Sequence, residues 1–302
     1  MWRVAIMTDQ PGWHGAQLRR AFKARGVATR YVDLAQCRID LGAATHGLVL
    51  PGFERRLPDG VFVRGITAGT LEQITLRLDF LHAMQEIGIA VHNDAGAIER
   101  SVDKARTSLL LRRAGVPTPP TWVCESAVQA RAVLMRETAP GHELVVKPLF
   151  GSQGKGLLRL AAGADIPPAD AYGGVWYLQR FVPGIDGHWQ DWRVLVAGNG
   201  VVAAMARHGR DWINNVARGA RCERVEIEEI MRRLAVDAAR AVAMDYAGVD
   251  IMRDREGRLT VIEVNSIPAW KGLQGVTGFN IAERLVDDFI QRRLARPLEA
   301  AC

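Results

Sequence analysis

The sequence predicts an N-terminal α/β layer domain followed by a region rich in β-hairpins. Three observations lead to this fold class. Short apolar strands alternate with helices over residues 1–95, two strands flank a glycine-rich loop between residues 144 and 160, and residues 248–265 form two β-branched runs joined by a turn. The two later features place charged and amide side chains on strands, so they also carry the expected chemistry.

The first 95 residues read as short parallel strands connected by crossover helices. The first loop lacks the glycine pattern G-x-G-x-x-G, which excludes the usual dinucleotide fingerprint. The expected strands are 4–7, 28–32, 47–50 and 61–64, and the expected helices are 15–25 and 71–86.

The pattern changes near Asn93, where a turn precedes a helix expected over 98–114. Strands at 144–148 and 156–160 then follow, and the small, turn-rich stretch 162–174 is a candidate subdomain junction. We therefore divide the chain into units 1–95, 96–175 and 176–296.

The last unit starts with strands at 176–181, 193–197 and 201–207, and Asn199-Gly200 indicates a hairpin between the second and third. Amphipathic patterns predict helices over 228–244 and 281–294.

The segment 248–265 predicts a metal site. If Glu256-Gly257 form the loop, Arg255 faces Arg258, and Asp250 faces Glu263 five steps further out. Asn265 is two residues after Glu263 and leaves the same face of the strand. Oxygen ligands without thiolate or imidazole suit Mg²⁺ or Mn²⁺. The alternative is the polar edge of a solvated hairpin.

The glycine-rich loop runs from Gly151 to Gly156 and includes Ser152, Gln153, Gly154 and Lys155. Backbone amides of such a loop can bind phosphate oxygens, although a plain hairpin turn is equally consistent with this loop alone. Lys147 ends an apolar strand, so its anionic partner is either a phosphate or a structural carboxylate. Lys104 lies early in its helix, where a phosphate would meet free amides, although most such lysines are merely solvated.

A further group of polar side chains follows these strands. Asp191 and Arg193 share a strand face, and Arg207, Asn214, Asn215 and Arg218 come after them. Arginines and amides can bind carboxylate and phosphoryl groups, or they can simply coat a surface. Upstream, the strand end Gln179-Arg180-Phe181 could form a hinge whose backbone pairs with a purine.

Composition narrows the class of protein. A net charge of +6 over 302 residues suits an anionic substrate, and the absence of a dense Lys/Arg run argues against nucleic acid. No apolar stretch approaches a membrane span, and the first residues do not have the shape of a cleavable signal. The scattered cysteines favour a reducing cytoplasm over a disulfide framework; they are Cys37, Cys124, Cys222 and Cys302.

Taken in order, these motifs resemble the ATP-grasp superfamily and, within it, the RimK-type amino-acid ligases. The resemblance runs from about Ser101 to Ala282. Its pieces are Asp103-Lys104 with Thr107, residues 145–156, Asp191-Trp192-Arg193, residues 201–207, residues 215–219, Gly248–Ile251, Glu263-Val264-Asn265 and residues 277–282.

The resemblance implies a pre-ATP-grasp α/β domain and an α+β ATP-grasp domain whose two subdomains clamp ATP. It implies an enzyme that joins an amino acid, expected to be glutamate, to a small acidic acceptor, with no nucleic-acid or membrane partner and with a homo-oligomer as one option. ATP and Mg²⁺ or Mn²⁺ are the implied cofactors.

Residue roles carry over from the same resemblance. Lys104, Lys147 and the glycine-rich loop are expected at the phosphates, the Arg180-Phe181 backbone with neighbouring Gln179 at adenine, and Asp191 at the ribose. Asp250, Glu263 and Asn265 are expected to hold the metal, with Asn214 and Asn215 nearby. Arg193, Arg207 and Arg218 are expected to bind the acyl phosphate and the acidic substrate.

Two departures from the RimK pattern bear on the acceptor. Residues 266–272 replace the usual proline-glycine start with a bulkier sequence, and Arg180 stands where relatives often carry glutamate. The stretch 63–66 resembles the branch that acts on tetrahydromethanopterin- or methanofuran-type C1 cofactors. The alternatives are ligation to a protein C-terminus and an ATP-binding protein without turnover. We also expect that alanine at Asp250 or Glu263 abolishes turnover while leaving the fold intact.

Overall fold

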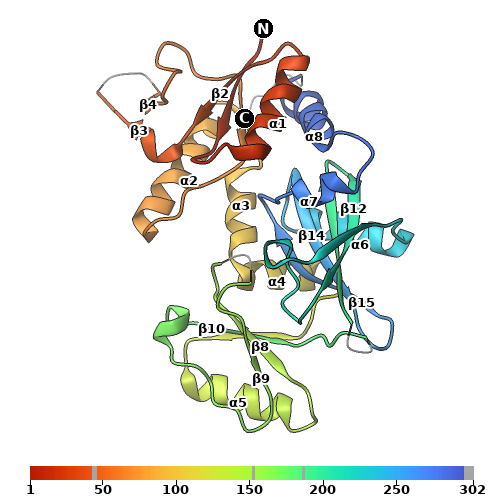
Figure 1. Cartoon of the computed structure of the whole chain (residues 1–302). Helices are drawn as coiled ribbons and strands as arrows, with labels where there is room; N and C mark the ends of the chain where they lie inside the picture. Colours follow the sequence, from red (N-terminus) through yellow and green to blue (C-terminus); the bar gives the residue numbers. More distant parts are fainter. Residues whose placement is uncertain (43–45, 152–153, 186–187, 296–302) are drawn as a thin grey trace.

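The computed structural model describes residues 1–42, 46–151, 154–185 and 188–295 (Figure 1). Its N-terminal sheet is parallel, as the sequence predicts, and its strand order is β2-β1-β5-β6, in which β6 was not predicted. Its strands are β1 (Arg3–Met7), β2 (Ala28–Val32), β5 (Gly60–Val63) and β6 (Ala90–His92). The strand expected at 47–50 lies outside this sheet: β4 (Leu48–Val49) pairs antiparallel with β3 (Arg38–Ile39). The 3₁₀ turn η1 (Leu34–Gln36) precedes β3.

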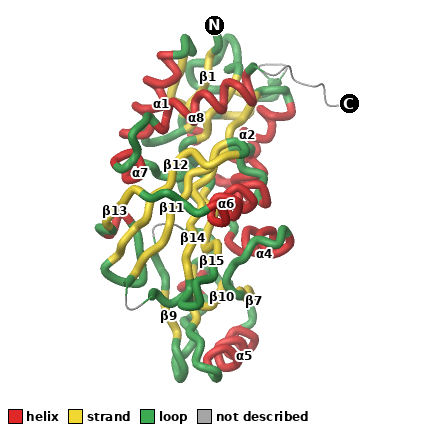
Figure 2. The backbone as a smooth tube through the Cα atoms, turned by 90° about the vertical axis from the view of Figure 1, so that its right-hand side faces the viewer, coloured by secondary structure: helices red, strands yellow, loops and turns green. Residues whose placement is uncertain are grey.

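Helices cover both faces of this sheet. Alternate residues of β1 point to opposite sides, so Val4 and Ile6 pack with α1 (Gly12–Ala24), whereas Ala5 and Met7 pack with α2 (Leu71–Glu86). The C-terminal helix α8 (Ile281–Phe289) lies on the same face as α1 (Figure 2). The chain therefore returns from its far end to complete the first core.

The helix expected over 98–114 is two helices, α3 (Ala95–Val102) and α4 (Lys104–Arg113). Asp103 separates them because it adopts an extended backbone and its carboxylate accepts the amide of Arg106. An aspartate that caps a helix in this way satisfies one of the free N-terminal amides. Lys104 is consequently the first residue of α4 and not a residue inside a longer helix.

The second sheet is antiparallel, with the strand order β7-β10-β8-β9, and α5 (Ala127–Thr138) packs against it. Its strands are β7 (Thr121–Cys124), β8 (Leu144–Lys147), β9 (Leu158–Leu160) and β10 (Trp176–Arg180). Because β10 pairs with both β7 and β8, the division expected after residue 175 cuts through this sheet. We therefore propose that the boundary between the two later units follows Arg180. The 3₁₀ turn η2 (Asp170–Tyr172) precedes β10.

The third sheet is also antiparallel, with the strand order β13-β12-β11-β14-β15, and α6 (Glu229–Ala241) packs against it. Its strands are β11 (Trp189–Ala197), β12 (Gly200–Gly209), β13 (Arg221–Arg224), β14 (Tyr246–Arg253) and β15 (Leu259–Asn265). The hairpin between β11 and β12 is confirmed, but its loop is Gly198-Asn199, one residue earlier than predicted. The remaining elements are η3 (Val216–Arg218), α7 (Lys271–Gly275) and a π-helical turn (Ile290–Leu294).

The hairpin of β14 and β15 pairs Asp250 with Glu263, as predicted, although its turn differs from the prediction. The loop spans residues 254–258, so that Arg253 faces Leu259 and the expected pairing of Arg255 with Arg258 is wrong. A register shift between Asp250 and Ile251 compensates for the longer loop. The two departures cancel, and Asp250 and Glu263 stay opposite each other in the strand register.

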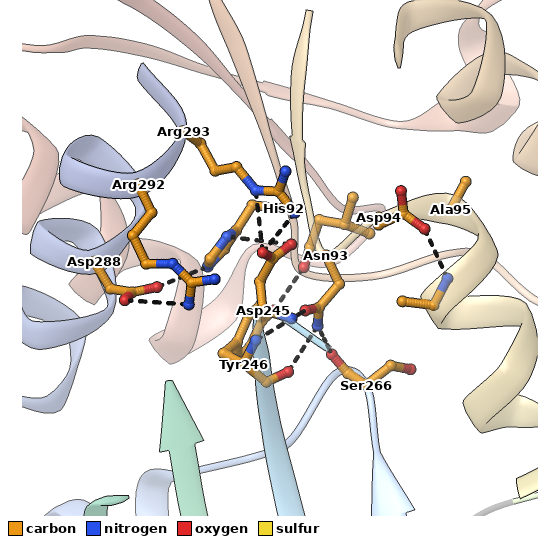
Figure 3. Close-up of polar contacts among 12 residues, drawn as sticks. His92, Asn93, Asp94, Ala95, Asp245, Tyr246, Ser266, Asp288, Arg292 and Arg293 are labelled. Atoms are coloured by element: carbon orange, nitrogen blue, oxygen red, sulfur yellow. Dashed lines mark hydrogen bonds and ion pairs between the residues drawn. The ribbon is translucent and has the colours of Figure 1, made fainter. Parts of the chain in front are cut away.

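Hydrogen bonds of the Asn93 side chain connect this hairpin to the N-terminal domain (Figure 3). Its side-chain amide donates to the carbonyls of Tyr246 at 2.8 Å and Ser266 at 2.6 Å, and its carbonyl oxygen accepts the amides of Asp245 at 2.8 Å and Tyr246 at 2.9 Å. All four bonds are buried, where hydrogen bonds are costly to leave unmade. One side chain therefore fixes the start of β14 and the residue after β15.

Within the described ranges, no helix is long and apolar enough to cross a membrane.

Candidate active site

A cleft lies between the second and third sheets and brings together most of the residues singled out in the sequence. Its walls come from β8, β10, α4 and the glycine-rich loop on one side, and from β11, β12, β14 and β15 on the other. The predicted residues that line it are Lys104, Lys147, Gly151, Gly154, Lys155, Gln179, Arg180, Phe181, Asp191, Arg193, Arg207, Asn214, Asn215, Asp250, Glu263 and Asn265. Ser152 and Gln153 lie outside the described residues.

Lys147 is held in place by a chain of hydrogen bonds whose other members are neutral side chains. Its ammonium donates to the side-chain oxygen of Gln179 at 2.6 Å, and the Gln179 amide donates to the Tyr177 hydroxyl at 3.0 Å. Tyr177 in turn shares a hydrogen bond of 2.7 Å with Ser108. Burial lowers the pKa of Lys147 to about 8, and the nearby Glu263 only partly opposes this. The structural carboxylate considered as a partner of Lys147 is thus a glutamine amide in this structure.

Lys104 contacts the loop that follows β8. Its ammonium donates to the carbonyls of Leu149 at 3.3 Å and Gly151 at 2.8 Å. Burial lowers the pKa of Lys104, and Glu263 raises it in opposition. Neither Lys104 nor Lys147 makes an ion pair within the described residues. Two partly buried ammonium groups therefore face one carboxylate across the cleft.

The glycine-rich loop approaches the opposite wall at Gly154. This residue has a φ of +70°, and a Cβ atom there would lie 2.6 Å from the side chain of Ile213. Only glycine fits this contact and this conformation without strain. The loop and the segment after β12 consequently meet over the cleft, which can exclude water from a bound ligand.

Two backbone amides of the hinge after β10 are occupied within the protein. The amide of Arg180 donates to the Pro120 carbonyl at 2.8 Å, and that of Phe181 to the Glu143 carbonyl at 2.8 Å. Neither amide can donate to a purine without losing its bond. Val182 lines the cleft, and among the described residues its amide has no hydrogen-bond acceptor. Among the amides of Arg180, Phe181 and Val182, that of Val182 is therefore the one available to a ligand in the described structure.

Three aromatic rings gather beside the hinge. The ring centroids of Phe181 and Trp189 are 6.0 Å apart, and those of Phe181 and Trp212 are 5.8 Å apart in an edge-to-face arrangement. All three line the cleft. Trp192 instead packs against the core of the third sheet.

Two arginines and two aspartates form a buried network on the third sheet. Arg207 donates to both carboxylate oxygens of Asp191, at 2.6 and 2.8 Å, and also pairs with Asp250 at 3.1 Å. Arg193 binds Asp250 through two nitrogens, one of them at 2.7 Å. Burial by itself would raise the pKa of Asp250, but the two arginines lower it below its usual value. The four charges cancel within the protein.

Glu263 and Asn265 complete the face predicted to hold a metal. Within the described ranges, the Glu263 carboxylate has no hydrogen-bond or ion-pair partner in the protein. Asn265 donates its amide to the Gly248 carbonyl at 3.2 Å, which leaves its side-chain oxygen available. In the described parts of the chain, no three His, Cys, Asp or Glu side chains form a metal cluster. Two carboxylates and one amide nevertheless suit Mg²⁺, which is usually completed by water and substrate phosphates.

Burial, reinforced by the neighbouring Asp250, raises the pKa of Asp191 to about 6 despite its bonds from Arg207. Both of its oxygens accept hydrogen bonds from Arg207, and its expected contact with the ribose stays a prediction. Asn214 donates to the Arg207 carbonyl at 2.8 Å, and Asn215 caps η3.

Two predicted residues do not line the cleft. Arg218 is half-exposed on η3 and lies 3.9 Å from Asp211, and Gly156 uses its carbonyl to accept the Tyr172 hydroxyl at 2.9 Å. Conversely, Tyr177, Ser108 and Ile213 line the cleft without having been predicted. The alternation of β10 gives the one available signal, because Tyr177 shares a strand face with Gln179.

Comparisons with known proteins agree with this geometry. Residues 101–289 match the family model described as RimK-like ATP-grasp domain, and residues 2–98 match the one described as RimK PreATP-grasp domain. The tetrahydromethanopterin:alpha-L-glutamate ligase of Methanococcus maripaludis is 34% identical over 75% of this chain and 77% of its own length. The ribosomal protein bS6--L-glutamate ligase of Escherichia coli is 32% identical over 94% of both chains.

Among solved structures, the ATP-grasp ligase PsnB with its minimal precursor superposes with a TM-score of 0.73. It is 22% identical and covers 95% of this chain and 98% of its own, so the likeness concerns the fold. The same ligase has also been solved with Mg and ADP.

Proposed function

Because the chain belongs to the RimK-like ATP-grasp family and is an ATP-grasp ligase, we propose that it joins L-glutamate to a small acidic cofactor or its precursor. The observation that carries this proposal is the cleft in which Lys104 and Lys147 face Glu263 and Asn265. Buried cations opposite metal-binding oxygens suit a magnesium nucleotide.

ATP would lie between the second and third sheets. The family uses ATP and Mg²⁺, and the residues of this chain fit both. Lys104, Lys147 and the glycine-rich loop would bind the phosphates, and the Val182 amide with the Phe181 ring would hold the adenine. Glu263 and Asn265, whose side-chain oxygens have no partner among the described residues, would hold Mg²⁺ together with Asp250, whose oxygens also bind Arg193 and Arg207. Mg²⁺ neutralises charge on the phosphates when bound.

The reaction proposed for this cleft needs no protein nucleophile. The acceptor carboxylate attacks the γ-phosphorus of ATP, which gives an acyl phosphate and ADP. The amine of glutamate then attacks the acyl carbon, phosphate leaves, and the amine loses a proton to form the amide. The protein contributes position and positive charge.

Of the predicted arginines, Arg193 is the best placed to bind substrate. It uses Nε and Nη2 for Asp250, so Nη1 remains available at the cleft. Arg207 is only 4% exposed and bridges Asp191 and Asp250, which makes it a positioning residue. The exposed Arg218 has no comparable place.

The acceptor has two candidate classes. One relative is named for a small-molecule acceptor, tetrahydromethanopterin, and another for a protein acceptor, bS6. The bS6 ligase aligns with this chain along almost the full length of both. We favour the small molecule because the bulky segment 266–272, with the buried Trp270, follows the proposed metal ligands directly.

The test is to incubate the purified protein with ATP, Mg²⁺ and L-glutamate, together with either tetrahydromethanopterin or ribosomal protein bS6. ADP release and the mass of the product are measured for each acceptor. A glutamyl adduct of tetrahydromethanopterin supports the proposal, whereas an adduct found on bS6 alone assigns the protein acceptor. ADP release that depends on neither acceptor counts against both.

A further inference from the structure

A second group of charged and polar side chains lies at the carboxyl ends of β1 and β5. These two strands are neighbours, but the helices that follow them, α1 and α2, cover opposite faces of the sheet. In an open parallel sheet, such a point leaves a crevice in which ligands bind. Arg64 follows β5 at this position, and its amide donates to the carbonyl of Met7 at the end of β1 at 2.9 Å.

The guanidinium of Arg64 has no carboxylate partner in the described parts of the chain. It donates to the Ile267 carbonyl at 3.4 Å and lies 5.1 Å from the ring centroid of Trp270. Its Nε is buried and has no hydrogen-bond partner. Burial lowers the pKa of Arg64, opposed only by Tyr246. A partly buried guanidinium without a carboxylate partner attracts an anion.

His14 and Lys271 add two further donors. The amide of Trp270 donates to His14 Nε2 at 3.1 Å, so we assign the ring hydrogen to Nδ1. Burial, with Arg64 and Lys271 nearby, lowers the pKa of His14 to about 4, and the ring is neutral at pH 7. The nearby acid Asp9 would contact a Cβ on Gly65, but it makes no ion pair with Arg64 in the described ranges.

One loop joins this group to the cleft. Ile267 is two residues after Asn265, so the carbonyl that Arg64 binds follows the proposed metal ligands directly. On the other side of the loop, a Cβ on Gly248 would lie 2.8 Å from Pro268 and 3.4 Å from Arg193 Nη1. The segment 266–270 therefore separates the arginine proposed to act in the reaction from Arg64.

We propose that Arg64, His14 and Lys271 form a binding site for a carboxylate of one of the two non-nucleotide substrates. The inference rests on the proposed function, because it takes the substrates to be L-glutamate and an acidic acceptor. A carboxylate accepts in-plane hydrogen bonds from a guanidinium and needs further donors from the side, which the imidazole and the ammonium supply.

The test is calorimetric titration of the full-length protein, loaded with ADP and Mg²⁺, with L-glutamate and with tetrahydromethanopterin in separate arms. The variants are Arg64→Met and Lys271→Met. The control is Arg19→Met, because Arg19 also lies over an aromatic ring of the same domain, 5.6 Å from the centroid of Tyr31. Charge-assisted hydrogen bonds predict that Arg64→Met weakens binding of one probe by about tenfold or more. ADP affinity should stay within about twofold of wild type, and Arg19→Met should bind both probes normally.

The probe whose binding is weaker in Arg64→Met identifies the substrate that supplies the carboxylate. Unchanged binding of both probes, with or without a lower melting temperature, overturns the inference and leaves Arg64 a structural residue. If Arg64→Met does not fold, the exposed Lys271 decides: normal binding in Lys271→Met then overturns the proposal. Product formation is measured separately. A wild-type protein that binds a probe through Arg64 but forms no glutamyl product defeats the proposed function alone.

Discussion

The two walls of the cleft differ in whether their buried charged side chains have partners of opposite charge. On the third sheet, Arg193 and Arg207 are matched by Asp191 and Asp250, so these four charges cancel without any ligand, and Glu263 adds an acid that has no partner among the described residues. On the other wall, Lys147 donates to a neutral amide and Lys104 to backbone carbonyls. Matched charges maintain the shape of a site, whereas unmatched charges mark where an anion binds.

This contrast predicts the largest effect at Asp250. Asp250→Ala leaves two buried guanidinium groups without their shared partner, so we expect a loss of about 3–5 kcal/mol in the free energy of unfolding. The sequence alone predicts an intact fold for this variant, whereas the ion pairs predict a less stable one. Denaturant unfolding measures the loss, and wild-type stability in Asp250→Ala would show that the network contributes little.

Glu263→Ala should lower turnover without lowering the stability of the fold. Since Glu263 pairs with no protein group among the described residues, we expect unchanged unfolding but a loss of turnover of roughly 1000-fold, the equivalent of several kcal/mol of metal stabilisation. The assay is ADP release with saturating ATP and Mg²⁺. Near-normal turnover in this variant would remove the basis for the metal assignment.

Lys147→Met tests the wall of the cleft whose lysines have no carboxylate partner. We expect the dissociation constant for Mg·ADP to rise by about 10- to 100-fold, because one charge-assisted hydrogen bond to phosphate is lost. Lys23→Met, in the exposed part of α1, is the control and should bind like wild type. Calorimetry measures both, and equal affinities would place the phosphates elsewhere.

The same lysine predicts a pH dependence. Its pKa is lowered to about 8 in the free protein, and bound phosphates would raise it. Above pH 8, binding must therefore take up a proton, and nucleotide affinity should fall by up to about tenfold per pH unit. Below pH 8 the lysine is already charged and this slope vanishes. Lys147→Met should lack the slope, and a slope that persists in this variant has another origin.

The smallest effect is expected at Arg218. It is half-exposed, its closest acid is 3.9 Å away, and it does not line the cleft. Arg218→Ala should change stability by less than about 0.5 kcal/mol and leave nucleotide affinity unaltered. A large rise in the KM for the acceptor would instead restore the substrate-binding role expected from the sequence.

Local patterns predicted most of the strands and helices, because hydrophobic period and turn residues are written into short windows of sequence. They also brought Asp250 opposite Glu263, although this rested on a two-residue loop that the chain does not have. The bulge that repairs the pairing has no local signature. Long-range partners were beyond such reasoning: nothing near Lys147 indicates that Gln179, 32 residues later, is its acceptor.

The same limit applies to the hinge and to the helix break. The amides of Arg180 and Phe181 are taken by carbonyls from β7 and β8 flanks, which only the folded sheet brings close. By contrast, the break at Asp103 could have been predicted, since aspartate is a strong N-cap whose carboxylate accepts the backbone amide three residues later.

The packing of α8 against α1 bears on how the protein is made. Gly60 of β5 has no side chain, and a Cβ there would collide with Phe289 at 2.8 Å and Leu294 at 2.6 Å. This face of the first sheet is therefore covered in part by α8, which is translated long after β5. Until α8 is made, that part of the face is exposed to chaperones and to other nascent chains, and a chain truncated before residue 281 has an open core.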